Sequence, residues 1–276
     1  VSFLLEALAA AYWQYVKSGA EDYASEHSDK VTVEVKGPSS ETAFDEMQNM
    51  IETDLSSGTY DGIVISPLQS DTAAQLVSGT KLPIVAIDTN FTAPEVKSFV
   101  GTGNEAAAKK GGEAAVEAAK AAGWTDIKCI EIAGVQGDQT NTARMNGYKA
   151  GVEEAGGTFL SDEVQYADAT ADRATTAMEA IMQTHPEGIA IICANNDDMA
   201  MAAARAAQGH DAYKNTIFLG FNGDRAACEA ILDGQMTMSV AQMAYEMGYK
   251  AVETMVQVLD GETVDEFVDS GSDVVT

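Results

Sequence analysis

Polar and aromatic residues stand where buried apolar runs of the sequence end. Residues 188–193 form one such run and lead into Asn195 and Asn196, and residues 61–65 form another that ends at Ser66. Carboxylate and amide oxygens accept hydrogen bonds from hydroxyl groups, a guanidinium donates a rigid fork, and aromatic faces cover C–H surfaces. The sequence therefore predicts non-covalent binding of a small polyhydroxylated ligand. The candidate ligand-binding residues are Glu6, Tyr12, Trp13, Ser66, Asp88, Thr89, Thr102, Arg144, Asn196, Phe221, Asn222 and Gln242.

Several of these residues also have a purely structural interpretation, which the sequence leaves open. For Tyr12, Trp13 and Phe221 the alternative is a place in the core, because aromatic side chains bury large apolar areas. For Asp88 and Asn196, which precede helical sequence, the alternative is a helix cap, and ligand binding is favoured for all five.

The residue types that carry out catalysis are present but poorly placed. His27, His185 and His210 follow predicted helices, so in a parallel sheet they lie at the edge opposite the strand carboxyl ends. The sequence has no Gly-x-Ser-x-Gly elbow and no P-loop. We therefore expect no catalytic residue and a protein that is not an enzyme.

Cofactor and metal sites are likewise not indicated. Residues 101–106 fit the G-x-G-x-x-A dinucleotide fingerprint, but they follow the fifth strand and lack the acidic residue expected about 20 positions later. We expect their glycines to let the chain cross between lobes. Cys129, Cys193 and Cys228 lack metal-ligand spacing, and three buried free thiols are favoured over one disulfide, whose formation the sequence does not decide.

The elements that must position the candidate residues alternate strictly between strand and helix. Such alternation predicts parallel sheets with helices on both faces. The strands are expected at residues 1–5, 31–35, 63–65, 82–87, 98–100, 128–133, 158–165, 188–193, 216–219 and 237–241. Helical spacing of apolar residues is found in the segments between them, for example at residues 140–155, 171–183, 225–232 and 243–259.

Two matching halves of this kind predict two α/β lobes. We place residues 1–102 and 243–270 in the first lobe and residues 103–242 and 271–276 in the second. The length of 276 residues and the hydrophobic content of 46% suffice for two ordinary cores.

Composition limits the partners and the location of the chain. Sixteen basic and 43 acidic residues give a formal net charge of −27, which would repel phosphate backbones and anionic lipid, so we expect no nucleic-acid partner. The acidity fits a saline habitat or a simple solubility requirement equally well. No apolar run approaches the roughly 18 residues that a membrane span needs. Val1 opens directly into the first predicted strand, so we expect that any export signal has been removed.

Short motifs surround many of the candidate residues. They are Tyr12-Trp13 ahead of residues 17–20, residues 83–88 (Pro-Ile-Val-Ala-Ile-Asp), Arg144-x-x-Gly147-Tyr148, His185-Pro186, residues 196–200 (Asn-Asp-Asp-Met-Ala), residues 220–223 (Gly-Phe-Asn-Gly) and Gln242. Together they resemble the type 1 periplasmic binding proteins, in particular the sugar-specific, ribose-binding branch, over nearly the whole chain. The resemblance implies two lobes joined by a three-segment hinge that close over a ligand in the cleft between them.

The same resemblance implies a function and a role for each residue. Tyr12, Trp13 and Phe221 would sandwich a sugar, and the residues that would hydrogen-bond its hydroxyl groups are Asp88, Arg144, Asn196 and Gln242. The protein would be a monomeric solute-binding subunit of an ABC importer, periplasmic or exported and membrane-tethered, that presents its ligand to the membrane permease. We expect Arg144 to be solvated until the lobes close, and its loss to leave the stability of the unliganded protein almost unchanged.

Three departures from the family pattern bear on the ligand. Many relatives have Asp at the position of Asn222, Arg at the position of Thr89 and an aromatic residue at the position of Ala169, so charge and bulk are lost here. Glu6 adds an acceptor. We expect a neutral monosaccharide or polyol, without predicting which one.

Two other classes of protein share the predicted fold. The effector-binding core of a lobe-type transcription repressor is one alternative, disfavoured by the lack of a helix-turn-helix ahead of the first strand and by the charge of −27. A small-molecule α/β enzyme is the other, disfavoured because no catalytic constellation is evident.

Overall fold

The computed structural model describes residues 1–8, 11–40 and 42–276 and divides into two units. The first unit holds residues 1–102 and 243–271, and the second holds residues 103–242 and 272–276. The sequence placed Gly271 in the second lobe, whereas the structure places it in the first unit. There its backbone has a φ of +96°, and its N–H donates to Asp269 Oδ1 at 3.0 Å.

The first unit is built on a parallel sheet of six strands in the order β12-β5-β4-β3-β1-β2. Its strands are β1 (Ser2–Leu4), β2 (Glu34–Lys36), β3 (Ile63–Ile65), β4 (Ile84–Ile87), β5 (Val96–Gly101) and β12 (Phe267–Asp269). Its helices are α1 (Ala11–Glu26), α2 (Phe44–Ser57), α3 (Ser70–Val77) and α9 (Ala244–Leu259). Alternate strand residues face opposite sides, so Phe3 and Val64 pack under α1 and α9, while Leu4 and Ile65 pack under α2 and α3.

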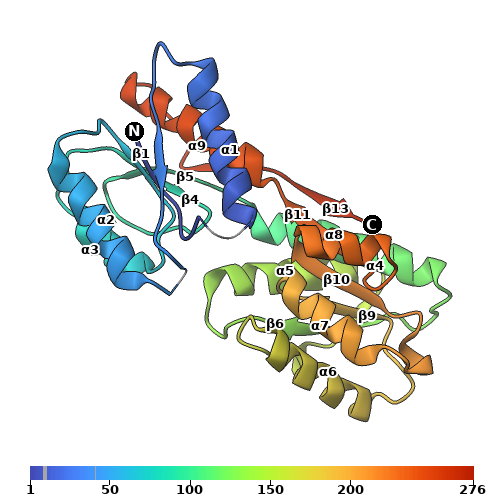
Figure 1. The fold of residues 1–276 in the computed structure, drawn as a ribbon. Helices are drawn as coiled ribbons and strands as arrows, with labels where there is room; N and C mark the ends of the chain where they lie inside the picture. Colours follow the sequence, from blue (N-terminus) through green and yellow to red (C-terminus); the bar gives the residue numbers. More distant parts are fainter. Residues whose placement is uncertain (9–10, 41) are drawn as a thin grey trace. The chain divides into compact units, whose positions relative to one another are not determined.

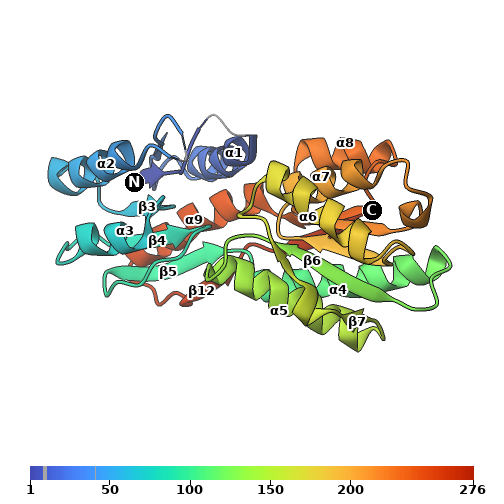
Figure 2. The ribbon, with the colours of Figure 1, turned by 90° about the horizontal axis from the view of Figure 1, so that it is seen from below.

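Helices α1 and α9 pack side by side on one face of this sheet (Figures 1 and 2). Glycine at the contact allows a close approach of the two backbones. A Cβ atom added at Gly248 would lie 1.9 Å from the carbonyl oxygen of Val16, and one added at Gly19 would lie 1.9 Å from that of Tyr245. The two helices therefore fit together only because both positions lack a side chain.

The second unit contains a seven-stranded sheet in the order β13-β11-β10-β9-β6-β7, with β8 also paired to β6. Its strands are β6 (Lys128–Ala133), β7 (Thr158–Phe159), β8 (Gln165–Tyr166), β9 (Ile191–Ala194), β10 (Ile217–Asn222), β11 (Met238–Gln242) and β13 (Ser272–Val275). The pairings are parallel except that β13 runs antiparallel to β11.

Helices cover both faces of the second sheet. Helices α4 (Asn104–Ala121) and α5 (Gln139–Glu154) lie on one face, and α6 (Ala171–Thr184), α7 (Asp197–Ala207) and α8 (Arg225–Leu232) lie on the other (Figure 2). Two short 3₁₀ helices complete the unit, η1 (Ser161–Glu163) and η2 (Asp211–Tyr213). The predicted α/β class, with two parallel-sheet lobes flanked by helices, is confirmed.

Three predictions for the second unit and the chain end were incomplete. The strand expected at residues 158–165 is two short strands, β7 and β8. Phe159 pairs with Cys129 and Gln165 pairs with Ile132, so a step of six residues here matches a step of only three along β6. The extra residues form η1. The strand expected at 216–219 continues to Asn222, since Gly220 and Phe221 pair with β11. The edge strands β12 and β13 were missed because neither has an extended apolar run.

Most of the candidate residues stand at or just after the carboxyl ends of these strands, whereas Tyr12 and Trp13 lie on α1 and Arg144 lies on α5. No helix among the described residues is both long and apolar enough to cross a membrane.

His27 and His185 follow α1 and α6, and His210 lies between α7 and η2, so none follows the carboxyl end of a strand.

Candidate ligand-binding site

In the first unit, a hydrogen-bond network joins side chains at the carboxyl ends of three adjacent strands. Glu6 follows β1, Ser66 follows β3 and Thr89 follows β4. Oε1 of Glu6 accepts from Ser66 Oγ at 3.0 Å and from Thr89 Oγ1 at 2.9 Å. Two hydroxyl donors therefore orient one carboxylate at this edge of the sheet.

Asp88 extends the same network toward α1. Its Oδ1 accepts from the Tyr12 hydroxyl at 2.6 Å, and its Oδ2 lies 3.4 Å from Thr89 Oγ1, whose one hydrogen it shares with the closer Glu6. The backbone of Asp88 has φ of +59°, a left-handed conformation that non-glycine residues adopt at a cost and that is concentrated at binding sites. Asp88 does not cap the next helix, because α3 precedes it and β5 follows it in the chain.

The aromatic pair of α1 divides between the core and the edge. Trp13 is 3% exposed and belongs to the core under α1 and α9, whereas Tyr12 is half-buried. The two rings meet edge to face, with centroids 5.0 Å apart. The structure thus supports the structural interpretation for Trp13 and leaves Tyr12 at the edge. Thr102 is buried at the end of the first segment of this unit.

In the second unit, Arg144 is held by three contacts. Its Nε donates to Asn104 Oδ1 at 2.8 Å, and one terminal nitrogen donates to the carbonyl oxygen of Asn195 at 2.8 Å. Its guanidinium carbon lies 3.8 Å from the centroid of the Phe221 ring, a cation–π contact. Arg144 is 8% exposed, so the expectation that it is solvated is wrong. Arg144 lies on the buried face of α5, and its guanidinium group lies against Phe221 near the end of β10.

Phe221 is fully covered. It is 0% exposed and packs in the core formed by α4, α5 and the sheet of the second unit, with the Arg144 guanidinium against its ring. The structure therefore places Phe221 in the core and not at an open edge. Sequence reasoning also missed Asn104 and Asn195, which hold Arg144; the available signal was that each stands at a strand-to-helix junction beside a candidate residue.

Three amide side chains occupy the ends of β9, β10 and β11. Asn196 caps α7, since its Oδ1 accepts from the Met199 N–H at 2.9 Å, and its Nδ2 donates to the carbonyl oxygen of Ala169 at 3.2 Å. Gln242 Nε2 donates to Asn222 Oδ1 at 3.0 Å. Asn196, Asn222 and Gln242 each remain partly exposed.

The buried carboxyl group of Asp197 joins three elements at this edge of the sheet. Asp197 accepts from Ser239 Oγ at 2.6 Å and from the Asp224 N–H at 2.8 Å, which ties α7 to β11 and to the start of α8. Burial raises the pKa of Asp197 to about 6, although these hydrogen bonds act in the opposite direction. Asp197 therefore links the elements next to the three amide side chains.

The structure thus groups the candidate residues into two sets. The first-unit set, connected by hydrogen bonds, offers two carboxylates and three hydroxyl groups and consists of Glu6, Tyr12, Ser66, Asp88 and Thr89. The second-unit set offers a guanidinium and three amides and consists of Arg144, Asn196, Asn222 and Gln242. Both kinds of group hydrogen-bond to hydroxyls, and no group of His, Cys, Asp and Glu among the described residues could hold a metal ion.

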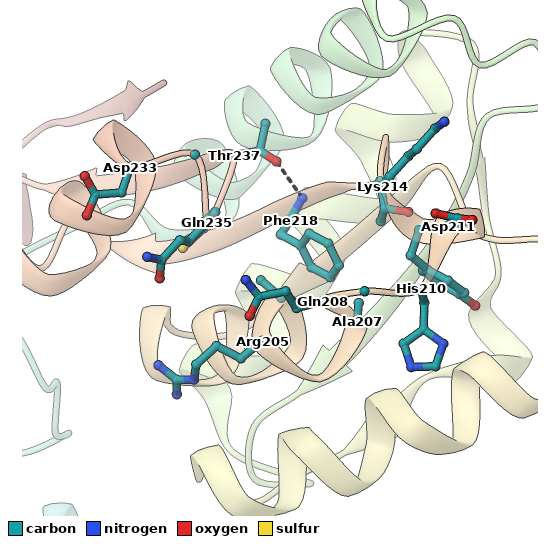
Figure 3. Close-up of a pocket in the computed structure, with 16 residues that line it drawn as sticks. Arg205, Ala207, Gln208, His210, Asp211, Lys214, Phe218, Asp233, Gln235 and Thr237 are labelled. Atoms are coloured by element: carbon teal, nitrogen blue, oxygen red, sulfur yellow. Dashed lines mark hydrogen bonds between the residues drawn. The ribbon is translucent and has the colours of Figure 1, made fainter.

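A separate pocket of about 500 Å³ lies at the other edge of the second sheet (Figure 3). Its walls are the end of α7, η2 and the segment between α8 and β11, including Gln208, Lys214 and Gln235. Thr237 stands beside the start of β10, where its Oγ1 accepts from the Phe218 N–H at 3.1 Å. None of the candidate residues lines this pocket.

Known proteins share both the sequence pattern and the fold. The family model described as periplasmic binding protein domain matches residues 1–263. The ribose import binding protein of Escherichia coli strain K12 is 30% identical over 206 residues, covering 73% of this chain and 67% of the relative. The D-allose-binding periplasmic protein of the same organism is 29% identical over 263 residues, covering 92% and 82%.

A solved structure agrees over the full chain. The sugar ABC transporter (sugar-binding protein) of Bacillus halodurans has a TM-score of 0.85 and 20% sequence identity, covering 100% of this chain and 96% of that one. This likeness concerns the fold. Together with the family model, which spans nearly the whole sequence, it leads to one conclusion. The chain belongs to the periplasmic binding protein family.

Proposed function

We propose that this protein is the solute-binding component of an ABC importer and that it binds a neutral monosaccharide or polyol. The observation that carries the proposal is the pair of polar sets at the strand carboxyl ends, which offer carboxylate acceptors in one unit and amide donors and acceptors in the other. The names of the relatives support it, since they bind or import ribose and allose. These are binding proteins and not enzymes, and their names give no support to the repressor alternative.

The proposed ligand contacts both sets of residues. In the first unit, Glu6 and Asp88 accept from hydroxyl groups of the ligand, and Tyr12 covers one of its faces. In the second unit, Asn196, Asn222 and Gln242 supply amide donors and acceptors. We assign Trp13, Phe221 and Arg144 to the support of these groups, because each is buried within its own unit.

The charges near the two sets favour a neutral ligand over an acidic one. Two carboxylates, Glu6 and Asp88, stand in the first set, and the single cation of the second set, Arg144, already packs on Phe221 and bonds to Asn104 and Asn195. A ligand carboxylate would therefore meet like charge. Like charges disfavour one another most where water is excluded.

The family implies a periplasmic location, and we propose a monomer that is exported and delivers its ligand to the membrane subunits of the importer.

A thermal-shift screen tests the binding function. A ligand that binds only the folded protein raises its apparent melting temperature, by an amount that grows with ligand concentration. We expect a neutral pentose, hexose or polyol to stabilise the protein and the corresponding sugar acid to stabilise it less. Asp88→Asn should weaken the response, and Asp233→Asn, at the pocket of Figure 3, should leave it unchanged. A screen of pentoses, hexoses and polyols without any stabilisation would refute the proposal.

A further inference from the structure

Two cysteines of the second unit face each other across adjacent strands. Cys129 on β6 and Cys193 on β9 have their Sγ atoms 3.4 Å apart, and both are 0% exposed. In the parallel register, Cys129 pairs with Ile191 and Glu131 pairs with Cys193, so the two cysteines are diagonal neighbours. Both pack in the core under α4 and α5, which shows that they lie on the same face of the sheet.

We propose that Cys129 and Cys193 are a disulfide-forming pair that is oxidised while the chain folds. An external disulfide of the thiol-oxidoreductase or glutathione type supplies the oxidant. The thiolate of one cysteine attacks it to form a mixed disulfide, and the second thiolate displaces the leaving thiol. The products are the Cys129–Cys193 bond and two reduced thiols of the external disulfide, which take up the two electrons and the two protons.

The geometry requires little movement for this bond. A disulfide has an S–S distance of about 2.05 Å, so the two sulfur atoms must approach by little more than one ångström. Diagonal neighbours on one sheet face have Cα atoms about 7–8 Å apart, so closing the bond needs a small approach of β6 and β9 in addition to side-chain rotation. The family's periplasmic location is an oxidising compartment, in which such bonds form and persist.

The burial of both cysteines indicates that the disulfide forms during folding and not afterwards. In the folded chain neither sulfur is exposed, and burial, together with the neighbouring Cys129, raises the pKa of the Cys193 thiol well above its usual range. Since the thiolate is the reactive form, the folded and reduced pair reacts slowly with external disulfides. Oxidation is therefore fast only while the strands are still accessible.

The third cysteine lies on another element and is less buried. Cys228 lies on α8, is partly exposed, and donates its S–H to the carbonyl oxygen of Gly223 at 3.7 Å. The proposal assigns it no partner in the disulfide. It therefore serves as an internal control, because it should remain a thiol when the other two have been oxidised.

Refolding in a redox buffer tests the proposal. The reduced, unfolded protein is refolded with reduced and oxidised glutathione, and its thiols are counted afterwards under denaturing conditions. We expect one thiol of the three to remain, a mass lower by two hydrogen atoms, and a peptide map that links Cys129 to Cys193. Three remaining thiols, or a link that involves Cys228, would overturn the proposal.

Variants and melting curves sharpen the test. Cys228→Ser should leave no free thiol, and Cys129→Ser should leave two. The oxidised wild type should melt roughly 10 °C above its reduced form, because the bond closes a long loop of the unfolded chain. If Cys129→Ser does not fold, the count in Cys228→Ser decides: two thiols after refolding contradict the pair.

Discussion

The guanidinium group of Arg144 is fixed by groups of its own unit. Two hydrogen bonds and the face of Phe221 hold it, and one of its acceptors is the carbonyl oxygen at the end of β9. The sequence identified Arg144 correctly as a residue of this edge but not as a buried one. Its burial depends on Asn104 and Asn195, whose contacts with it cross 40 and 51 positions of the chain and leave no local pattern.

Replacing Arg144 by Ala should therefore destabilise the protein even without ligand. The change leaves the acceptors of Asn104 and Asn195 without their donor, and a hydrogen bond to a charged group contributes about 1.5–3 kcal/mol. We expect the free energy of unfolding to fall by at least this amount in chemical denaturation. Arg205→Ala, at an exposed arginine of α7, is the matched control and should change it by about 0.5 kcal/mol or less. Equal stability of the two variants would contradict the contacts assigned to Arg144.

Glu131 is a buried acid that serves no part of the proposed site. It lies within β6, and neither of its carboxyl oxygens has a hydrogen-bond partner among the described residues. Burial raises its pKa from about 4.5 to about 8. The folded chain therefore holds this carboxyl protonated at neutral pH, whereas the unfolded chain ionises it.

The sign of the resulting pH dependence follows from linkage. Between pH 4.5 and pH 8 the folded state holds a proton on Glu131 that the unfolded state has lost, so the contribution of this residue to stability is greatest below pH 4.5 and falls until the folded pKa near 8 has been passed. Between pH 6 and pH 8 the loss is about 2 kcal/mol. Urea denaturation at the two pH values should show this loss in the wild type and a much smaller one in Glu131→Gln. A loss of the same size in both proteins would show that Glu131 is not its source.

At the scale of elements, the alternation of apolar runs predicted most strands and helices within a few residues of their bounds. This prediction failed for strands that are defined by their backbone pairing with a neighbouring strand and not by a hydrophobic pattern. Gly220, Phe221 and Asn222 were expected to follow the end of the strand but extend β10, because β11 offers them a parallel partner. Edge strands β12 and β13 were missed for the same reason, since their partners are far away in the sequence.

The contact between α1 and α9 gives an element-scale prediction. Gly248→Ala would bring a Cβ atom against the carbonyl oxygen of Val16, and backbone on both sides leaves little room for relaxation. We expect a loss of about 1–3 kcal/mol, the usual cost of overpacking. Ser18→Ala, at an exposed position of α1, is the control and should have little effect in the same denaturation experiment. A Gly248→Ala protein as stable as the wild type would contradict the close packing of these helices.

At the scale of the whole molecule, the motifs around the strand ends were sufficient to identify the family. Parallel strands place their carboxyl ends at a common edge of the sheet. Glu6, Ser66 and Thr89 could therefore be grouped from the sequence before their hydrogen bonds were known. The division of roles within the group depends on packing. Trp13 and Phe221 look like ligand-binding aromatics in sequence, yet each belongs to a core.

We propose that one neutral polyhydroxylated ligand binds to polar groups of both units. Calorimetric titration with the sugar that stabilises the protein most tests it directly, on the wild type, Asp88→Ala and Gln242→Ala. We predict one ligand per chain, an affinity roughly 10- to 150-fold lower in Asp88→Ala, where charged hydrogen bonds are lost, and roughly 2- to 10-fold lower in Gln242→Ala, where neutral ones are lost. Wild-type affinity in either variant would contradict a ligand held by residues of both units.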